Sequence, residues 1–287
     1  IVGAGIIGLS IAWQLARRSS LRIAVIEKGA GIGEGSTGAS SAICRVRYSV
    51  DETLLLARDG IDAYRQWKAF TGLAEPAAEF IQDGVLWMPG GDRAWADAEH
   101  QRMQGFGIAA EVLDDNDIAE RFPALSTCTL APDLDTGEAH ICEGNSRNLF
   151  EVEGGHVDPM AASSDLVEAC RNAGVEVRFR TEVVGVGVSG DRIQSVSLDD
   201  GDELATPLVI NAAGPWCNRL SAMVGLKVPW TLEPMRIQVM YRDRPDTLKG
   251  HIPVTADLAG GIYFRTQNNG RQLVVGSVRE EDEREVV

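Results

Sequence analysis

Residues 1–28 read IVGAGIIGLSIAWQLARRSSLRIAVIEK, and this stretch decides the fold of the first part of the chain. Ile1-Val2 ends a buried strand, Ile7–Arg18 has the apolar spacing of a helix, and Arg22–Glu27 is a short apolar run that ends in an acid. A strand, a helix and a second strand within about 30 residues match the size of a βαβ crossover. The opening residues therefore predict an α/β unit.

Three glycines, Gly3, Gly5 and Gly8, lie between the first strand and the helix as a G-x-G-x-x-G motif. The first permits a tight turn, the second lets backbone N–H groups approach a pyrophosphate, and the third lets helix and strand pack closely. The helix N-terminus adds unpaired donors and partial positive charge. Glu27 follows Gly8 by 19 residues, where a carboxylate accepts hydrogen bonds from ribose hydroxyls and repels a 2′-phosphate. The motif predicts a dinucleotide site that disfavours NADP; the alternative is a tight βα turn without a ligand.

The composition of the 287-residue chain excludes several partners. A net charge of −15 and a pI near 4.7 make nucleic acid an unsuitable partner, since its phosphates would be repelled. The sequence contains no apolar run of 18 residues, so no membrane-spanning helix is expected. The five cysteines are scattered and form no C-x-x-C pair, so we expect no metal site, no disulfide framework and a reducing cytoplasm.

The order of elements predicts two domains that are interleaved along the chain. Residues 54–71 have the pattern of one helix, and residues 126–155 have an irregular pattern. A second α/β pattern follows, with a helix capped by Asp158-Pro159 and a buried strand at 207–211. Further strands are predicted at 80–88, 175–179, 236–241, 261–265 and 272–278. We therefore expect one domain from residues 1–75 and 155–220, and a second from residues 76–154 and 221–287.

Three distant segments together resemble a known family. These are GHVDP at 155–159, GVEV at 174–177 and VINAAGPW at 209–216. They resemble the D-amino-acid-oxidase superfamily of flavoproteins, in the branch of sarcosine oxidase, glycine oxidase and dimethylglycine dehydrogenase. EPMRIQ at 233–238 and GGIYF at 260–264 resemble strands of that family's substrate domain. The resemblance spans nearly the whole chain and implies an α/β (α+β overall) fold, in which a Rossmann-like FAD-binding domain is interleaved with a substrate domain built on a large, mostly antiparallel sheet.

The resemblance also implies which residues hold FAD. The ADP moiety would contact the glycine turn and the end of the second strand, the pyrophosphate and flavin would contact the following loop, and adenine would pair with a backbone in a later strand. The residues so implied are Gly3, Gly5, Gly8, Glu27, Lys28, Ser36, Thr37, Ser40, Ser41, Val183, Ala212, Gly214 and Trp216. Ordinary strand core remains an alternative for Val183.

The same resemblance suggests residues for an amino-acid substrate. Arg45 would bind the substrate carboxylate, because a guanidinium can hold a carboxylate with two hydrogen bonds. If the segment is helical, Tyr48 lies on the same face as Arg45. If the segment is extended, Arg47 lies on the same face as Arg45. Tyr263 would close the pocket or form a hydrogen bond with the substrate; the alternative is that it serves only in packing. For Arg45 the alternative is an ordinary position on the surface. Arg236 is a weaker candidate.

Two departures from the family concern the electron acceptor and the flavin linkage. The family's oxidase branch carries a lysine in a Leu-Lys-Leu-Gly strand, whereas this chain has LVVG at 273–276. Valine supplies no positive charge, which favours a separate electron acceptor or a partner subunit over fast reaction with oxygen. No histidine occurs between Glu27 and Tyr48, which disfavours a covalent link through histidine. Because the sequence starts inside a strand and stops in an acidic run at 280–285, we expect the natural protein to be longer and this run to be mobile.

The sequence as a whole predicts an FAD-dependent oxidoreductase that acts on a small secondary or tertiary amino acid, such as sarcosine or dimethylglycine, by hydride transfer to flavin N5. Two alternatives stay open. One is a 2-hydroxy-acid oxidising enzyme of the same superfamily, because an arginine clamp would serve both substrates. The other is a non-catalytic FAD-binding subunit of a larger complex.

Overall fold

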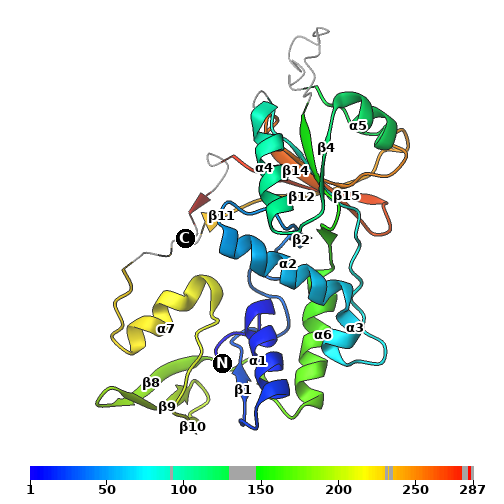
Figure 1. The fold of residues 1–287 in the computed structure, drawn as a ribbon. Coiled ribbons are helices and arrows are strands. Elements are labelled where there is room, and N and C mark those ends of the chain that lie inside the picture. Colours follow the sequence, from blue (N-terminus) through cyan, green and yellow to red (C-terminus); the bar gives the residue numbers. More distant parts are fainter. Residues whose placement is uncertain (91–92, 129–146, 230–231, 233–234, 280–283, 286–287) are drawn as a thin grey trace. The chain divides into compact units, whose positions relative to one another are not determined.

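The computed structural model describes residues 1–90, 93–128, 147–229, 232, 235–279 and 284–285 (Figure 1). The chain forms two compact units. Unit 1 comprises residues 1–42, 66–79 and 157–234, and unit 2 comprises residues 43–65, 80–156 and 235–287. Relative to the bounds expected from sequence, residues 43–65 and 155–156 belong to unit 2, and residues 76–79 and 221–234 belong to unit 1.

Unit 1 contains a parallel sheet, and the glycine turn follows Val2, which pairs on both sides within it. Strand β1 (Ala24–Ile26) pairs in parallel with β7 (Glu176–Arg178), and Val2 forms parallel bridges to both Ile26 and Asn211. The amide of Val2 donates to the carbonyl of Ile210 at 2.9 Å, which fixes the segment around Asn211 beside the first strand. The predicted βαβ unit is therefore present, with residues from three distant parts of the sequence in one sheet.

Helices α1 (Ile6–Arg18) and α6 (Pro159–Asn172) pack against each other in unit 1 (Figure 1). The predicted cap of α6 is confirmed, because the Asp158 side chain accepts from the amides of Met160 and Ala161. An antiparallel sheet of β8 (Val183–Ser189), β9 (Arg192–Leu198) and β10 (Glu203–Ala205) follows, and a turn at Gly190-Asp191 joins the first two strands. The unit also contains η1 (Gly214–Trp216) and α7 (Cys217–Met223).

The segment at 207–211 differs from the prediction of a buried strand. Only Asn211 forms a bridge, and Leu208 is 61% exposed. Among the described residues this segment has a neighbouring strand on one side only, so its apolar side chains are not enclosed. Hydrophobic composition alone could not reveal that the strand lies at a sheet edge.

The predicted helix at 54–71 is two helices. Helix α2 (Asp51–Arg65) buries Leu54 and Ile61 in the core of unit 2, whereas α3 (Trp67–Thr71) buries its residues in unit 1. Gln66 between them has non-helical dihedral angles (φ −108°, ψ 31°). The break occurs because the two halves belong to different cores.

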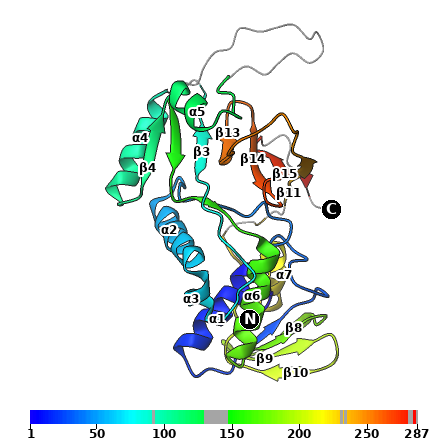
Figure 2. The same cartoon turned by 90° about the vertical axis from the view of Figure 1, so that its right-hand side faces the viewer.

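The large sheet of unit 2 is mostly antiparallel, as predicted. In the described part of the chain it has the strand order β12-β15-β14-β13-β3-β5-β4. Its only parallel pairing among these strands joins β13 to β3 (Figure 2). The strands are β3 (Val85–Met88), β4 (Ala110–Leu113), β5 (Asn148–Glu151), β12 (Val239–Asp243), β13 (Val254–Asp257), β14 (Ile262–Gln267) and β15 (Gln272–Ser277).

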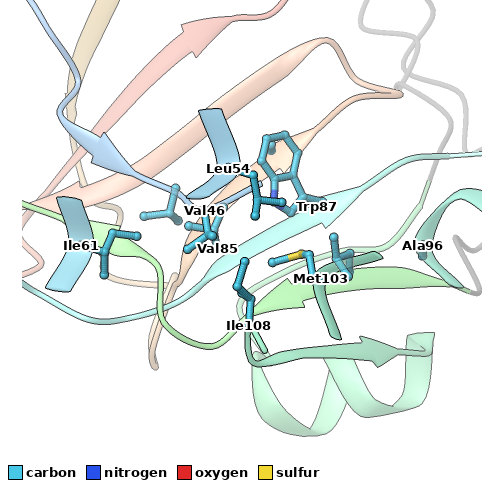
Figure 3. Close-up of a cluster of buried hydrophobic side chains, with 11 residues drawn as sticks. Val46, Leu54, Ile61, Val85, Trp87, Ala96, Met103 and Ile108 are labelled. Atoms are coloured by element: carbon cyan, nitrogen blue, oxygen red, sulfur yellow. The ribbon is translucent and has the colours of Figure 1, made fainter. Parts of the chain in front are cut away.

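Each face of this sheet has its own apolar core. Because strand side chains alternate, Val85 and Trp87 lie on one face and Leu86 and Met88 on the other. The first face packs against α2 and α4 (Arg93–Gly105), with Leu54, Met103 and their neighbours filling the space (Figure 3). The second face packs against α5 (Asp115–Arg121), whose N-terminus is closed by a capping box at Asp114.

The remaining short strands pair antiparallel, β2 (Ile43–Cys44) with β6 (Gly155–His156) and β11 (Met235–Arg236) with β16 (Arg284–Glu285). The expected mobile run at 280–285 lies mostly outside the described residues, as does most of the region at 126–155 that the sequence left irregular. None of the helices formed by described residues combines the length and hydrophobicity needed to cross a bilayer.

Candidate cofactor site and substrate-binding residues

The glycine turn in unit 1 is packed too tightly for side chains at two of its three glycines. Gly3 has a φ of +105°, and a Cβ there would lie 2.3 Å from the carbonyl oxygen of Ala212. A Cβ on Gly8 would lie 2.0 Å from the carbonyl oxygen of Gly3. Both positions therefore require glycine, because any side chain would displace the backbone.

The N-terminus of α1 offers backbone donors. Gly5 is its N-cap and has no side chain, and the first turn carries no acidic residue. The amide of Ile6 donates to Thr37 Oγ1 at 3.1 Å, which holds the following loop against the helix start. Partial positive charge and unsatisfied amides at such an end attract phosphate. The turn therefore fits the pyrophosphate of a dinucleotide.

Glu27 is held beside this turn by two backbone amides. Its carboxylate accepts from Ala4 at 2.8 Å and from Gly29 at 2.7 Å. Each carboxylate oxygen can accept a further hydrogen bond, so the side chain keeps acceptor capacity for ribose hydroxyls.

Lys28, the loop at 33–42 and Trp216 lie close to the same turn within unit 1. Lys28 Nζ lies 3.5 Å from the centroid of the Trp216 ring, and a Cβ on Gly35 would lie 3.8 Å from that ring. In the loop, Ser40 Oγ accepts from the amide of Ala42 at 2.9 Å, while Ser36 is exposed and Ser41 is half-buried. Gly214 has a φ of +52° and no atom where its Cβ would lie.

Val183 is a core residue by its side chain. It is 6% exposed and packs with Ile26, Val196 and Leu198. This placement agrees with the strand-core alternative, and a backbone role toward adenine stays a prediction.

In unit 2, Arg45 is half-buried between two aromatic rings. Its guanidinium carbon lies 4.2 Å from the centroid of the Tyr48 ring and 5.1 Å from that of Trp87. Its Nη1 donates to the carbonyl of Arg47 at 2.8 Å. The segment is not helical, yet Arg45 and Tyr48 are in contact because the side chain folds back over the ring.

Arg45 differs from its neighbours in having no carboxylate within ion-pairing distance among the described residues. Arg47 pairs with Glu99 at 3.1 Å, and Arg102 pairs with Glu99 and with Asp51. The charge of Arg45 acts on the buried Glu151, but a half-buried guanidinium that forms no ion pair is suited to receive a carboxylate from a ligand.

Tyr263 lies on the same face of the large sheet as Trp87. The register places Trp87, Ala256 and Tyr263 opposite one another on three adjacent strands, about 10 Å from first to last. The Tyr263 ring lies over Gly276, where a Cβ would be 2.3 Å from its hydroxyl oxygen. Tyr48 and Tyr263 thus pack against the same core of unit 2, and Arg45 contacts this core through Tyr48 and Trp87.

Of four further positions, the structure describes the side chains of two. The side chain of Arg236 and the cysteine at 142 lie outside what the structure describes. His156 is buried, with Nδ1 3.4 Å from Asp83 Oδ1. Val274, in the stretch without a lysine, is fully buried opposite Arg265.

Sequence reasoning missed Glu151 and Trp87, which both contact the Arg45 segment. Glu151 Oε2 accepts from the amides of Val46 at 2.5 Å and Arg47 at 3.2 Å, and its Oε1 accepts from Trp87 Nε1 at 2.5 Å. Burial raises the pKa of the Glu151 carboxyl, while these donors and Arg45 lower it by less. The one available signal was an acid at the end of the apolar run Asn148–Glu151.

Two of the thiols, one in each unit, have raised pKa values. Burial raises the pKa of Cys44 to about 12, against a smaller lowering by Arg265, and raises that of Cys170 to about 11. Within the described residues, no group of three or more His, Cys, Asp or Glu side chains could hold a metal ion.

A parallel sheet, a glycine turn that excludes side chains and a helix start with free donors define a dinucleotide-binding protein. The model of the DAO family, FAD dependent oxidoreductase, matches residues 1–286. The chain belongs to this family of FAD-dependent oxidoreductases.

Individual relatives agree with this assignment. The chain is 28% identical to hydrogen cyanide synthase subunit HcnC of Pseudomonas aeruginosa, over 98% of this chain and 71% of that protein. It is 25% identical to mitochondrial dimethylglycine dehydrogenase of Rattus norvegicus, over 94% of this chain but only 30% of that protein. L-proline dehydrogenase from P. horikoshii has the same fold, with a TM-score of 0.77 and 22% identity over 96% of this chain and 67% of that one.

Proposed function

We propose that this chain oxidises the C–N bond of a small secondary or tertiary amino acid of the sarcosine or dimethylglycine kind. The observation that carries the proposal is Arg45, a half-buried guanidinium that forms no ion pair with a carboxylate among the described residues, although its charge acts on the buried Glu151. A substrate carboxylate would supply that partner through two parallel hydrogen bonds. The names of relatives that act on dimethylglycine and proline support an amino acid as substrate.

Residues of unit 1 would hold the cofactor. The amides at the start of α1 would bind the pyrophosphate, and Glu27 would accept from the ribose. Lys28, Ser36, Thr37, Ser40, Ser41, Val183, Ala212, Gly214 and Trp216 would complete the contacts. Bound FAD supplies the acceptor for the hydride equivalent removed from the carbon beside nitrogen.

Residues of unit 2 would orient the substrate. Arg45 would bind the substrate carboxylate. The rings of Tyr48 and Trp87, which the Arg45 guanidinium contacts, restrict the orientations of that guanidinium. Tyr263 would contact the substrate from the neighbouring strands, with its hydroxyl as a hydrogen-bond donor. Orientation of the reacting carbon is the contribution that such residues make to the rate.

The electron acceptor is proposed to be separate from oxygen. Val274 is fully buried and Val275 is uncharged, so the strand at 273–276 presents no cation. A relative is named as a subunit of a larger enzyme, which supports transfer to a partner subunit or another acceptor.

The proposal is tested by anaerobic reduction of the purified, FAD-bound protein. Sarcosine, dimethylglycine and proline are added separately, and loss of the visible flavin absorption is followed. We expect at least one of them to bleach the flavin, and Arg45→Met to weaken this response by about a hundredfold, since it removes a charged bidentate contact. Arg58→Met is the control, because the ion pair that Arg58 forms with Asp59 is exposed and involves none of the residues proposed for the substrate.

Two other results would favour the alternatives. Bleaching by a 2-hydroxy acid and not by any amino acid would point to the hydroxy-acid alternative. Bound FAD that none of these compounds reduces would point to a non-catalytic subunit. Failure to bind FAD at all would contradict the assignment of the cofactor site.

A further inference from the structure

Glu151 is a fully buried carboxylate at the end of a central strand. It is 0% exposed, and its two oxygens accept three N–H donors, from Val46, Arg47 and Trp87. Two of these donors are backbone amides 105 and 104 residues away in the sequence. The carboxylate therefore ties β5 to the segment that follows β2.

Besides Glu151, the backbone of this segment is bonded by arginine side chains, with Arg45 donating to the carbonyl of Arg47 and Arg102 to that of Tyr48. Residues 45–48 lie in neither helix nor strand, so no ladder of backbone hydrogen bonds fixes Arg45. The same carboxylate also orients Trp87, whose ring lies 5.1 Å from the Arg45 guanidinium. One buried group thus fixes both the backbone next to Arg45 and one of the rings on which Arg45 stacks.

Stability alone is a poor explanation for a charge at this place. Apolar Val85 lies opposite it on the neighbouring strand, and the charge of Arg45 acts on it without forming an ion pair within the described residues. Replacement of buried charges by well-packed apolar residues is often neutral or stabilising, so the free energy of folding does not by itself account for a carboxylate at this place.

We propose that Glu151 is a positioning residue for substrate binding, which holds Arg45 in the orientation that receives the substrate carboxylate. This inference rests on the proposed function, because it assigns Arg45 to that carboxylate. Glu151 does not touch the substrate; it acts through Val46, Arg47 and Trp87.

Unit 1 contains a matched control in Asp165. This carboxylate is 4% exposed and also accepts from one indole and two consecutive amides, of Trp67, Ala77 and Ala78, each at 2.8 Å. It contacts none of the residues proposed for the substrate. Glu151→Gln and Asp165→Asn therefore make the same chemical change, and both are expected to lower the melting temperature.

The experiment compares KM and kcat of the two FAD-saturated variants with the amino acid that reduces the wild-type protein fastest and an artificial electron acceptor. We expect Glu151→Gln to raise KM about tenfold or more, with a smaller change in kcat, because a displaced Arg45 binds the carboxylate poorly. Asp165→Asn should leave KM within about twofold, since its damage is confined to a site without a substrate role. Equal KM values in both variants, whether unchanged or raised, would overturn the inference.

A double variant separates positioning from loss of folding. In Glu151→Gln the new side-chain amide has one acceptor oxygen, so its NH₂ group must face either the backbone amides or the indole N–H. Trp87→Phe removes the indole donor and lets the amide oxygen serve Val46 and Arg47. We expect Glu151→Gln/Trp87→Phe to recover part of the lost affinity relative to Glu151→Gln, and a further loss would contradict the inference.

Hydrogen exchange tests the positioning without any substrate. The amides of Val46 and Arg47 should exchange at least about tenfold faster in Glu151→Gln than in Asp165→Asn, because they lose their acceptor. Equal exchange would refute the role of Glu151 even if no amino acid reduced the flavin. Faster exchange in a protein that no amino acid reduces would instead refute the proposed function.

Discussion

Replacing Gly8 with alanine should weaken both the fold of unit 1 and its hold on FAD. Gly8 lies in the first turn of α1, and a Cβ there would lie 2.0 Å from the carbonyl oxygen of Gly3 and 3.3 Å from Ala212 Cβ. Real Cβ contacts shorter than 3.0 Å essentially do not occur, so the helix must move by about 1 Å away from the turn. The amides that face the pyrophosphate move with it.

The expected magnitude follows from two opposing effects. Overpacking lowers the free energy of unfolding by about 1–3 kcal/mol, and the higher helix propensity of alanine offsets up to about 1 kcal/mol of this loss. The net loss of about 1–2 kcal/mol corresponds to roughly 2–8 °C in melting temperature. Loss of one hydrogen bond to a charged phosphate costs about 1.5–3 kcal/mol, so the Kd for FAD should rise by at least about tenfold.

Thermal unfolding and titration of the apoprotein with FAD provide the assay, and Gly60→Ala provides the control. Gly60 also lies within a helix, α2, but no atom lies within 4 Å of its Cβ position. Alanine there should raise stability by about 0.5–1 kcal/mol and leave FAD binding unchanged. If Gly8→Ala melted at or above the wild-type temperature and bound FAD equally well, the reasoning from close packing would be refuted.

Three further predictions concern single carboxylates and thiols. Glu27→Ala should raise the Kd for FAD about tenfold or more, measured by the same titration, because ribose hydroxyls lose a charged acceptor; an unchanged Kd would remove Glu27 from the site. Cys44 and Cys170, with pKa values of about 12 and about 11, should resist iodoacetamide at pH 8 in the native protein and react after unfolding. At this pH only roughly one Cys44 thiol in ten thousand and one Cys170 thiol in a thousand is ionised. Rapid alkylation of the native protein at these two residues would contradict the raised pKa values. Burial raises the pKa of Glu151, so its contribution to the free energy of folding is greatest below its unfolded pKa near 4.5 and falls as the pH rises. The stability of the wild-type protein relative to Glu151→Gln should therefore decrease from pH 5 to pH 8. An increase would contradict the direction of the pKa shift.

The features that the sequence predicted best are those determined by neighbours in the chain. The glycine turn and α1 need only the spacing of Gly3 to Gly8, and the cap of α6 needs only Asp158 and the residues after it. Such local rules operate within one or two turns of helix, so they can be applied without knowledge of the fold.

The features that it missed depend on residues far apart. Glu151 acquires its role only when β5 reaches the segment around Val46, more than a hundred residues earlier. The break at Gln66 arises because α2 and α3 pack in separate cores, although their apolar pattern is continuous in the sequence. Exposure of Leu208 likewise depends on which strands flank it. Family resemblance led to Arg45 and Tyr263 but not to the groups that hold them.

The pairing of β3 with β13 has a consequence during synthesis. These strands are about 170 residues apart, so the ribosome finishes β3 long before its parallel partner emerges. Until then the buried residues Val85–Met88 have β5 on one side and an open edge on the other. An apolar strand edge that stays unpaired during synthesis can pair with another nascent chain. The yield of folded protein in a heterologous host should therefore depend on chaperones and on growth temperature.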